Sequence, residues 1–376
     1  METCFDDLRP YYQSEIPPAM RRIADSEYLP IMAAFVFPEK TAGEVRDILL
    51  NIRTTDEFQS QIMYRFNREV IRKSANAFTW SGLEHLEPEK RYLFISNHRD
   101  IMLDSSLLQT VFYTHGFRTT EITFGSNLMC SQLVVDIGKS NKMFTVFRGG
   151  SPRDFYRNSM HLSEYIRHTV AQKKESVWIA QRNGRTKDGN DITDQGIIKM
   201  FCMSDSSDPP RSICDLHPVP VAVSYQIESC DILKTRELYL SRDGRKYIKR
   251  PDEDLASILT GITQPKGNIH IHICDPLCEE EVRAIGYQHP NEFYKSAASL
   301  IDRRIRHGYR LHDNNYIAHD IRSGRDTYAA HYTPEKKAGF LARYEQMLQQ
   351  IKGDEPALRA IFLGIYANPV DNSEKV

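Results

Sequence analysis

Long hydrophobic runs and net charge are both missing from the sequence. No window approaches the roughly 20 consecutive apolar residues that a membrane-spanning helix needs, and the longest candidate, YLPIMAAFVFP, is too short and is bounded by prolines. Lys and Arg together number 49, against 50 Asp and Glu. We therefore expect no transmembrane helix, and the overall charge does not favour a nucleic-acid partner.

Cysteine is sparse and follows no pattern. The seven cysteines are an odd number, and no two are spaced as Cys-x-x-Cys, which argues against a disulfide framework and a zinc ribbon. This usage predicts a reducing compartment. The first residues, METCFDDLRPYYQSE, are acidic and polar and lack the form of a signal peptide. We expect a cytoplasmic protein, and one that meets lipid only from the inner surface of the membrane.

The hydrophobic pattern changes near residue 81. Before it, apolar residues have helical spacing, as at Val45, Leu49 and Ile52. After it, short β-rich runs alternate with amphipathic segments, which predicts an α/β fold with a mixed, largely parallel sheet flanked by helices. The expected parts are a helical N-terminal segment at 1–80, a central domain at 81–280 and a helical C-terminal extension with a polar tail at 281–376. The predicted strands are 91–96, 142–147, 176–181, 218–225 and 268–274, and the predicted helices include 100–116 and 151–174.

Polar residues and glycines follow three of the predicted strands. The carboxyl ends of parallel strands are where α/β sheets gather their sites, so we expect these residues to share a cleft. They are Asn97-His98-Arg99-Asp100 after the first strand, Arg148-Gly149-Gly150 after the second and Arg182-Asn183-Gly184-Arg185 after the third.

His98-Arg99-Asp100 has the form of a protein-kinase catalytic loop. A kinase also needs an Asn a few residues later, a glycine-rich loop before it and an Asp-Phe-Gly motif after it. None of these is present, and the preceding residues have a helical pattern. The motif is therefore not interpreted as part of a kinase.

His98 and Asp104 have the form of an acid–base pair. Imidazole accepts a hydroxyl proton near neutral pH, and a carboxylate at its other nitrogen fixes the tautomer. Asp104 is one turn into the predicted helix and Asp100 is the nearer acid, so either can be the partner. The structural alternative is that Asp100 only caps the helix while His98 binds a loop.

Four blocks in order resemble the glycerolipid acyltransferase superfamily, the glycerol-3-phosphate and 1-acylglycerol-3-phosphate acyltransferases, in its soluble bacterial-type branch. The chain departs from the family pattern twice. Five residues separate His98 from Asp104 where the family has four, and Asn183 precedes Gly184-Arg185 where the family has Glu-Gly. The blocks are ISNHRDIMLDSSLL, KMFTVFRG, WIAQRNGRTKDG and HPVPVAVSY.

The resemblance implies an O-acyltransferase with its catalytic domain at 81–280. His98 would be the general base and Asp104 would orient it. The acceptor, a glycerol phosphate or a lysophospholipid, would be held by Arg148, Asn183, Gly184 and Arg185. The donor would be a fatty acyl thioester, on coenzyme A or acyl carrier protein, and no cofactor, metal or nucleic acid is expected.

The two departures keep other functions open. The missing Glu keeps a non-phosphate lyso-aminolipid as a possible acceptor. Together with the longer spacing, it also leaves room for a lipid-binding scaffold without activity. A thioesterase that uses water as the acceptor is a further alternative, although it would need no pair of acceptor-holding arginines.

Three other features have a structural and a functional interpretation. His270, His272 and Cys274 alternate along a predicted strand, which suits either a metal site or a half-exposed strand. The basic stretches 241–251 and 302–310 suit either anionic lipid headgroups or solvated faces.

Overall fold

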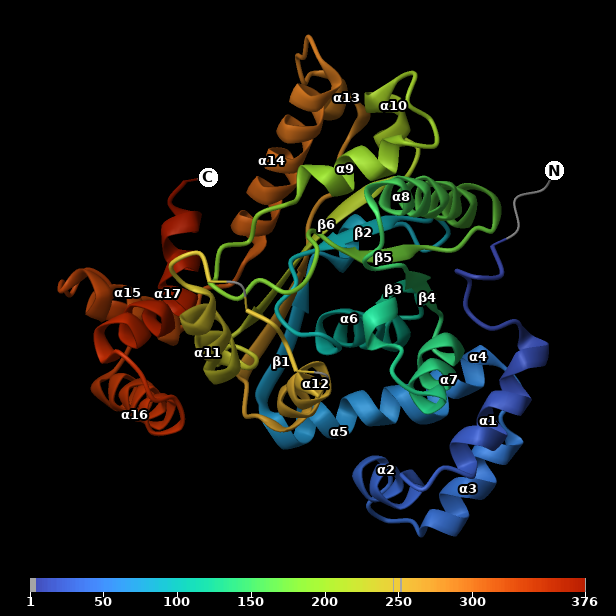
Figure 1. Ribbon diagram of the computed structural model, residues 1–376, viewed down its shortest axis with the longest axis horizontal. Coiled ribbons are helices and arrows are strands. Elements are labelled where there is room, and N and C mark those ends of the chain that lie inside the picture. The colour runs from blue at the N-terminus through green and yellow to red at the C-terminus, as the bar shows by residue number, and fades with distance from the viewer. Residues whose placement is uncertain (1–4, 246, 251, 376) are drawn as a thin grey trace.

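The computed structural model describes residues 5–245, 247–250 and 252–375. Its centre is a seven-stranded sheet in the order β1-β7-β6-β2-β5-β3-β4, with helices on both faces (Figure 1). The expected α/β class is therefore confirmed. The strands are β1 (Ala75–Ser81), β2 (Leu93–Ser96), β3 (Glu121–Gly125), β4 (Met143–Val146), β5 (Val177–Ala180), β6 (Pro218–Tyr225) and β7 (Gly267–Ile273).

Helices flank this sheet, and loops and short turns connect the elements of the described chain. The helices are α1 (Ile16–Ala24), α2 (Leu29–Val36), α3 (Ala42–Asn51), α4 (Thr55–Phe58), α5 (Tyr64–Ser74), α6 (Leu103–Thr114), α7 (Gln132–Ser140), α8 (Pro152–Arg167), α9 (Gln195–Cys202), α10 (Pro209–Cys214), α11 (Asp231–Ser241), α12 (Glu253–Thr263), α13 (Glu279–Arg283), α14 (Pro290–Gly308), α15 (Asp313–Ser323), α16 (Pro334–Gln350) and α17 (Glu355–Ser373). No helix among the described residues is long and apolar enough to cross a membrane.

The sheet is mostly parallel. β6, β2, β5, β3 and β4 pair in parallel, so their carboxyl ends meet at one edge. β7 runs antiparallel to β6, and β1 runs parallel to β7. The residues that follow β2, β4 and β5 therefore emerge at the same edge of the sheet, as the sequence predicts.

The expected N-terminal helical segment, 1–80, ends earlier than predicted. α5 stops at Ser74, and the next residues form the edge strand β1. The run ANAFTWS contains aromatic and β-branched residues, which favour strands. β1 pairs with β7, with Phe78 opposite Ile269. β3 was also absent from the predicted strands.

The central strand β2 is buried on both faces. Leu93 and Ile95 pack against a cluster that includes residues of α8, α9 and α14. Phe94 points to the opposite cluster, which includes residues of α5 and α6. This two-sided burial explains the continuous apolar run that predicts the strand. α8 begins at the expected cap, where Ser151 and Asp154 form a capping box.

Candidate active site

His98 and Asp104 form a hydrogen-bonded pair at the end of β2. His98 lies in the loop between β2 and α6, and Asp104 lies in the first turn of α6. His98 Nδ1 is 2.9 Å from Asp104 Oδ2. The ring of Trp178 packs edge-on against the imidazole, with centroids 5.9 Å apart. Within the part of the chain that the structure describes, no hydrogen bond occupies His98 Nε2, and the His98 side chain is 14% exposed.

Asp104 is fully buried and accepts several hydrogen bonds. Besides His98, its Oδ2 accepts the backbone N–H groups of Arg99 at 2.6 Å and Asp100 at 2.9 Å. Its Oδ1 accepts the hydroxyl of Tyr225, from β6, at 2.8 Å. Burial and the negative charge of Asp104 raise the pKa of Tyr225 above its ordinary value, so this phenol stays a donor. These contacts hold a buried carboxylate against the imidazole.

Asp100 has a different role in the loop. Its Oδ1 accepts the backbone N–H groups of Met102 at 2.9 Å and Leu103 at 2.8 Å, which caps the start of α6. Its Oδ2 accepts the hydroxyl of Ser229. Among the described residues, Asp100 makes no hydrogen bond to His98, so of the two acids left open by the sequence, Asp104 is the one beside the imidazole.

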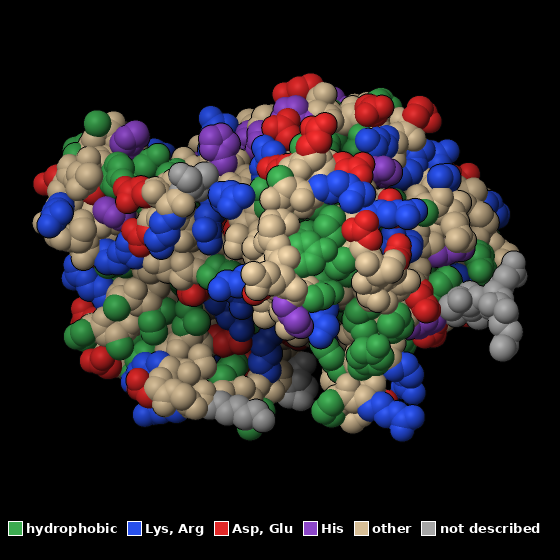
Figure 2. Space-filling model, turned by 90° about the horizontal axis from the view of Figure 1, so that it is seen from above, with side chains coloured by type: hydrophobic (Ala, Val, Ile, Leu, Met, Phe, Trp, Pro, Cys, Tyr) green, Lys and Arg blue, Asp and Glu red, His purple; other side chains and the backbone are tan. Residues whose placement is uncertain are grey.

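The loop after β5 lies against the His98 loop. The backbone N–H of Thr186 donates to the carbonyl of His98 at 2.7 Å. Arg185, the preceding residue, is 8% exposed, and its buried Nη1 has no hydrogen-bond partner among the described residues. A buried N–H without a partner is costly, so Nη1 of Arg185 can donate to an anionic ligand. Figure 2 shows Lys and Arg side chains gathered in a hollow at the lower edge of that view.

Arg148, at the end of β4, reaches the same loop. Its Nη1 donates to the amide oxygen of Asn183, and its backbone N–H donates to Ser126 Oγ at 3.0 Å. Gly184 adopts φ +77°, a left-handed conformation in which glycine is unstrained. The sequence-predicted residues are therefore linked in two groups, Arg148 with Asn183, and the Arg185 segment with His98.

The helix α12 forms a further wall near this site. Asp254 of α12 accepts a hydrogen bond at 3.2 Å from the side chain of Asn127, which follows β3. Asp254 also interacts electrostatically with Arg185. At Gly261 of α12, an added Cβ would lie 2.3 Å from Asp100 Oδ2. This glycine lets the helix approach the loop that carries His98. Pro220, from the sequence block HPVPVAVSY, lies inside the buried strand β6.

Sequence reasoning missed a buried ionic network beneath the His98 loop. Arg99 is fully buried and donates to Asp191, with Nη2 2.6 Å from Oδ2, and to Glu228 Oε2 at 3.1 Å. Lys234 donates to Glu228 and, at 2.7 Å, to the carbonyl of Arg99. Arg99, Asp191 and the segment that carries Glu228 and Lys234 are far apart in sequence and lie in no shared motif. Only the fold brings them together.

The strand β7 runs antiparallel to β6 and lies between β6 and the edge strand β1. His270 and His272 both bond Ser81 of β1, at 3.1 and 2.8 Å, and Cys274 donates to a backbone carbonyl of α14. Among the described residues, no group of three His, Cys, Asp or Glu can hold a metal ion. These histidines are therefore part of the β1–β7 packing.

The basic stretches are partly neutralised by local ion pairs. In 241–251, Lys249 pairs with Asp254 at 2.7 Å, while positions 246 and 251 lie outside the described residues. In 302–310, Arg304 pairs with Glu281 at 3.1 Å, and Tyr309 is buried. Much of their charge is thus matched within the protein.

The comparisons with known proteins are sparse. No family model matches the chain, and no curated protein matches it. One similar solved structure is the 1-acyl-sn-glycerophosphate (LPA) acyltransferase PlsC from Thermotoga maritima. It shares 14% sequence identity with this chain at a TM-score of 0.38, and the match covers 78% of this chain and 97% of that one.

Proposed function

We propose that the protein is an O-acyltransferase that moves a fatty acyl group from a thioester to a hydroxyl of a glycerol-phosphate or lysophospholipid-type acceptor. The observation that carries this proposal is the His98–Asp104 pair beside the segment of Arg185; His98 Nε2 and the buried Nη1 of Arg185 have no hydrogen-bond partner among the described residues. A general base and an anion-binding group beyond the carboxyl ends of two neighbouring strands suit an acceptor that has a hydroxyl near a phosphate.

In the proposed reaction, His98 Nε2 takes the proton of the acceptor hydroxyl as its oxygen attacks the thioester carbonyl. The C–O bond forms, and the collapse of the tetrahedral intermediate breaks the C–S bond. The imidazolium returns the proton to the leaving thiolate, so the products are an ester and a free thiol. Asp104 holds the ring in the Nδ1–H tautomer and stabilises the imidazolium.

Arg185 and Arg148 are proposed to hold the acceptor phosphate, with Asn183 and Gly184 shaping the turn between them. A guanidinium suits a phosphate because its planar donors form paired hydrogen bonds. Asn183 already accepts from Arg148. It would therefore act by orienting that arginine, where an ionised Glu would add a charge.

The test is thiol release from a long-chain acyl-CoA or an acylated carrier protein, with glycerol 3-phosphate, lysophosphatidate or a lyso-aminolipid as the acceptor. We expect a phosphate-bearing acceptor to stimulate release and His98→Ala to lower the rate at least about a hundredfold. Stimulation by the lyso-aminolipid alone would favour the second acceptor class. Lipid binding with no release from either donor would favour a scaffold without activity.

A lipid acceptor also leads us to propose that the protein works as a peripheral protein at the inner face of the membrane. Flotation with vesicles of anionic and of zwitterionic phospholipid tests this directly. Failure to float with either kind would contradict it.

A further inference from the structure

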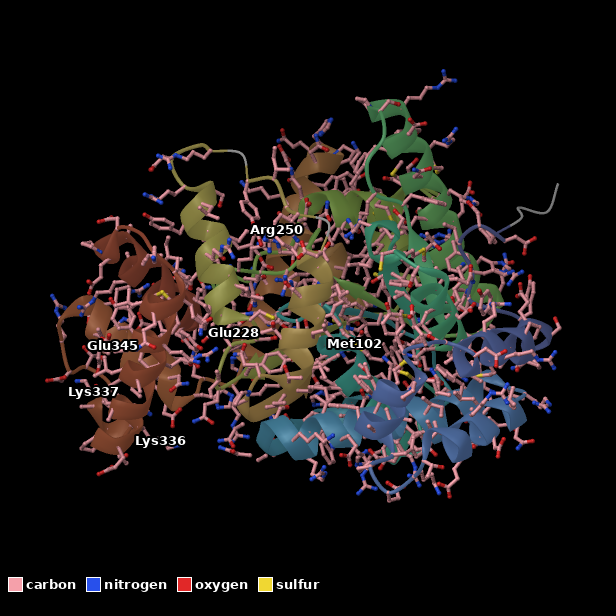
Figure 3. The ribbon with its side chains drawn as sticks, turned by 60° about the horizontal axis from the view of Figure 1, so that its bottom comes forward. Met102, Glu228, Arg250, Lys336, Lys337 and Glu345 are labelled. Atoms are coloured by element: carbon pink, nitrogen blue, oxygen red, sulfur yellow. The ribbon has the colours of Figure 1, made fainter. Side chains whose placement is uncertain are left out.

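The three C-terminal helices form a unit with its own apolar core, built mainly from residues of α15, α16 and α17. In Figure 1 they lie together at one side of the sheet, next to α11. α16 presents Lys336, Lys337 and Glu345 on the outer side of this unit (Figure 3).

The inner side of the unit reaches a buried carboxylate through Tyr366 of α17. The Tyr366 hydroxyl donates to Asp231 Oδ2 at 2.6 Å and accepts the backbone N–H of Glu228 at 3.2 Å. Arg343 of α16 donates to both oxygens of Asp231. Asp231 is fully buried at the start of α11, so these contacts fix the 228–231 segment to the C-terminal helices.

The 228–231 segment in turn holds the loop that carries His98. Glu228 accepts from the guanidinium of Arg99 and from Lys234, and Lys234 also binds the Arg99 carbonyl. Figure 3 shows Glu228 at the boundary between the C-terminal helices and the rest of the molecule. The side chain of Arg99 is thus held by Glu228, and its carbonyl is held by Lys234, which Glu228 also binds.

Arg99 links these contacts to the reactive pair. It directly follows His98, and its backbone N–H donates to the same Asp104 oxygen that accepts from His98. A shift of Glu228 would move the guanidinium and the peptide of Arg99. It would therefore also move Asp104 Oδ2, the oxygen that holds the imidazole of His98. The path from Tyr366 to Asp104 runs through hydrogen bonds between buried groups, which are stronger in a low dielectric than in water.

We infer that the C-terminal helices complete the active site, with Tyr366 acting as a positioning residue that fixes His98 and Asp104 through Glu228 and Arg99. The inference rests on the proposed function for its kinetic consequence. Its structural content, the alignment of the His98 ring, can be measured whether or not the reaction is the one proposed.

The experiment compares Tyr366→Phe with Tyr344→Phe. Both remove one buried hydroxyl from the same helical unit, but the hydroxyl of Tyr344 has no hydrogen-bond partner among the described residues. The first readout is ¹⁵N NMR of the histidine rings as a function of pH, with His98 assigned from the signal lost in His98→Gln. The second is thiol release under saturating donor, resolved into kcat and KM.

We expect Tyr366→Phe to shift the titration of His98 and to weaken its Nδ1–H tautomer signal. We also expect it to lower kcat about five- to tenfold, the worth of one hydrogen bond, with KM changed less than twofold. Tyr344→Phe should leave all of these at the wild-type values. Thermal unfolding will show that both variants are folded.

An unchanged His98 titration in Tyr366→Phe, or an equal change in Tyr344→Phe, overturns the inference. If wild-type protein releases no thiol with any donor, the proposed function fails, and the NMR comparison still decides whether Tyr366 positions His98.

Discussion

Asp104→Asn removes the charge that faces His98 while it keeps the shape of the side chain. The amide oxygen of Asn can still accept from His98 and from the backbone of the loop, and its NH₂ group can donate to the hydroxyl oxygen of Tyr225. The contacts of the ground state are therefore largely retained. The interaction that is lost is the attraction between the carboxylate and the imidazolium, which exists only after the proton has been transferred.

The size of the loss follows from the geometry. His98 Nδ1 and Asp104 Oδ2 are 2.9 Å apart, so the centres of the two charges are somewhat farther apart. At about 4 Å, two unit charges attract by about 4 kcal/mol at an effective dielectric constant near 20. Loss of about 4 kcal/mol of transition-state stabilisation lowers kcat roughly a thousandfold.

The assay is steady-state thiol release by wild type, Asp104→Asn and Asp100→Asn. Asp100 is the matched control because it is also a buried acid in the same loop, and Asn is an equally good cap for α6. We expect Asp100→Asn to stay within a few-fold of wild type. Activity of Asp104→Asn within about tenfold of wild type, or an equal loss in Asp100→Asn, would refute the assignment of Asp104.

Two further predictions concern binding and stability. Arg185→Met should lower kcat/KM by roughly 10–100-fold for a phosphate-bearing acceptor, because a charge-assisted hydrogen bond is worth about 1.5–3 kcal/mol. The same change should leave kcat/KM for a neutral acceptor unaffected. An equal loss for both acceptors would argue against phosphate binding by Arg185. Burial lowers the pKa of His270 and of His312 to about 4. The unfolded chain then binds more protons than the folded one below pH 6.5, so the free energy of unfolding should fall as the pH drops from 6.5 to 4, by up to about 1.4 kcal/mol per pH unit for each histidine. Urea unfolding at several pH values checks this, and His270→Gln should reduce the slope; a slope that His270→Gln leaves unchanged would contradict it.

Local sequence was enough to place His98 close to an acid in the next helix. β2, the loop and the first turn of α6 are contiguous, so the apolar run and the spacing of His98 and Asp104 already contain their relation. Ser151 likewise caps α8 through neighbours only three residues away. Only the structure decides between Asp100 and Asp104, because the choice depends on which carboxylate the turn directs toward the imidazole of His98.

Contacts between distant segments could not be predicted in the same way. β1 follows α5 directly, and although its aromatic and β-branched residues favour a strand, pairing with β7 is what fixes it as one. Arg99 belongs to a polar loop in the sequence, yet it is fully buried because Asp191 and Glu228, more than 90 residues later, supply its counter-charges. Such pairing leaves no signature in a single sequence.

The link between Tyr366 and the His98 loop also bears on how the protein is made. On the ribosome, the strands of the sheet emerge before α17, and domains generally fold as units from the N-terminal side. At about 5–20 residues per second, synthesis from His98 to Tyr366 takes roughly 10–50 s. During that interval a nascent chain can pair its central strands while Asp231 still lacks Tyr366 and Arg343. The loop that carries His98 thus acquires its support from the C-terminal helices only late in biosynthesis.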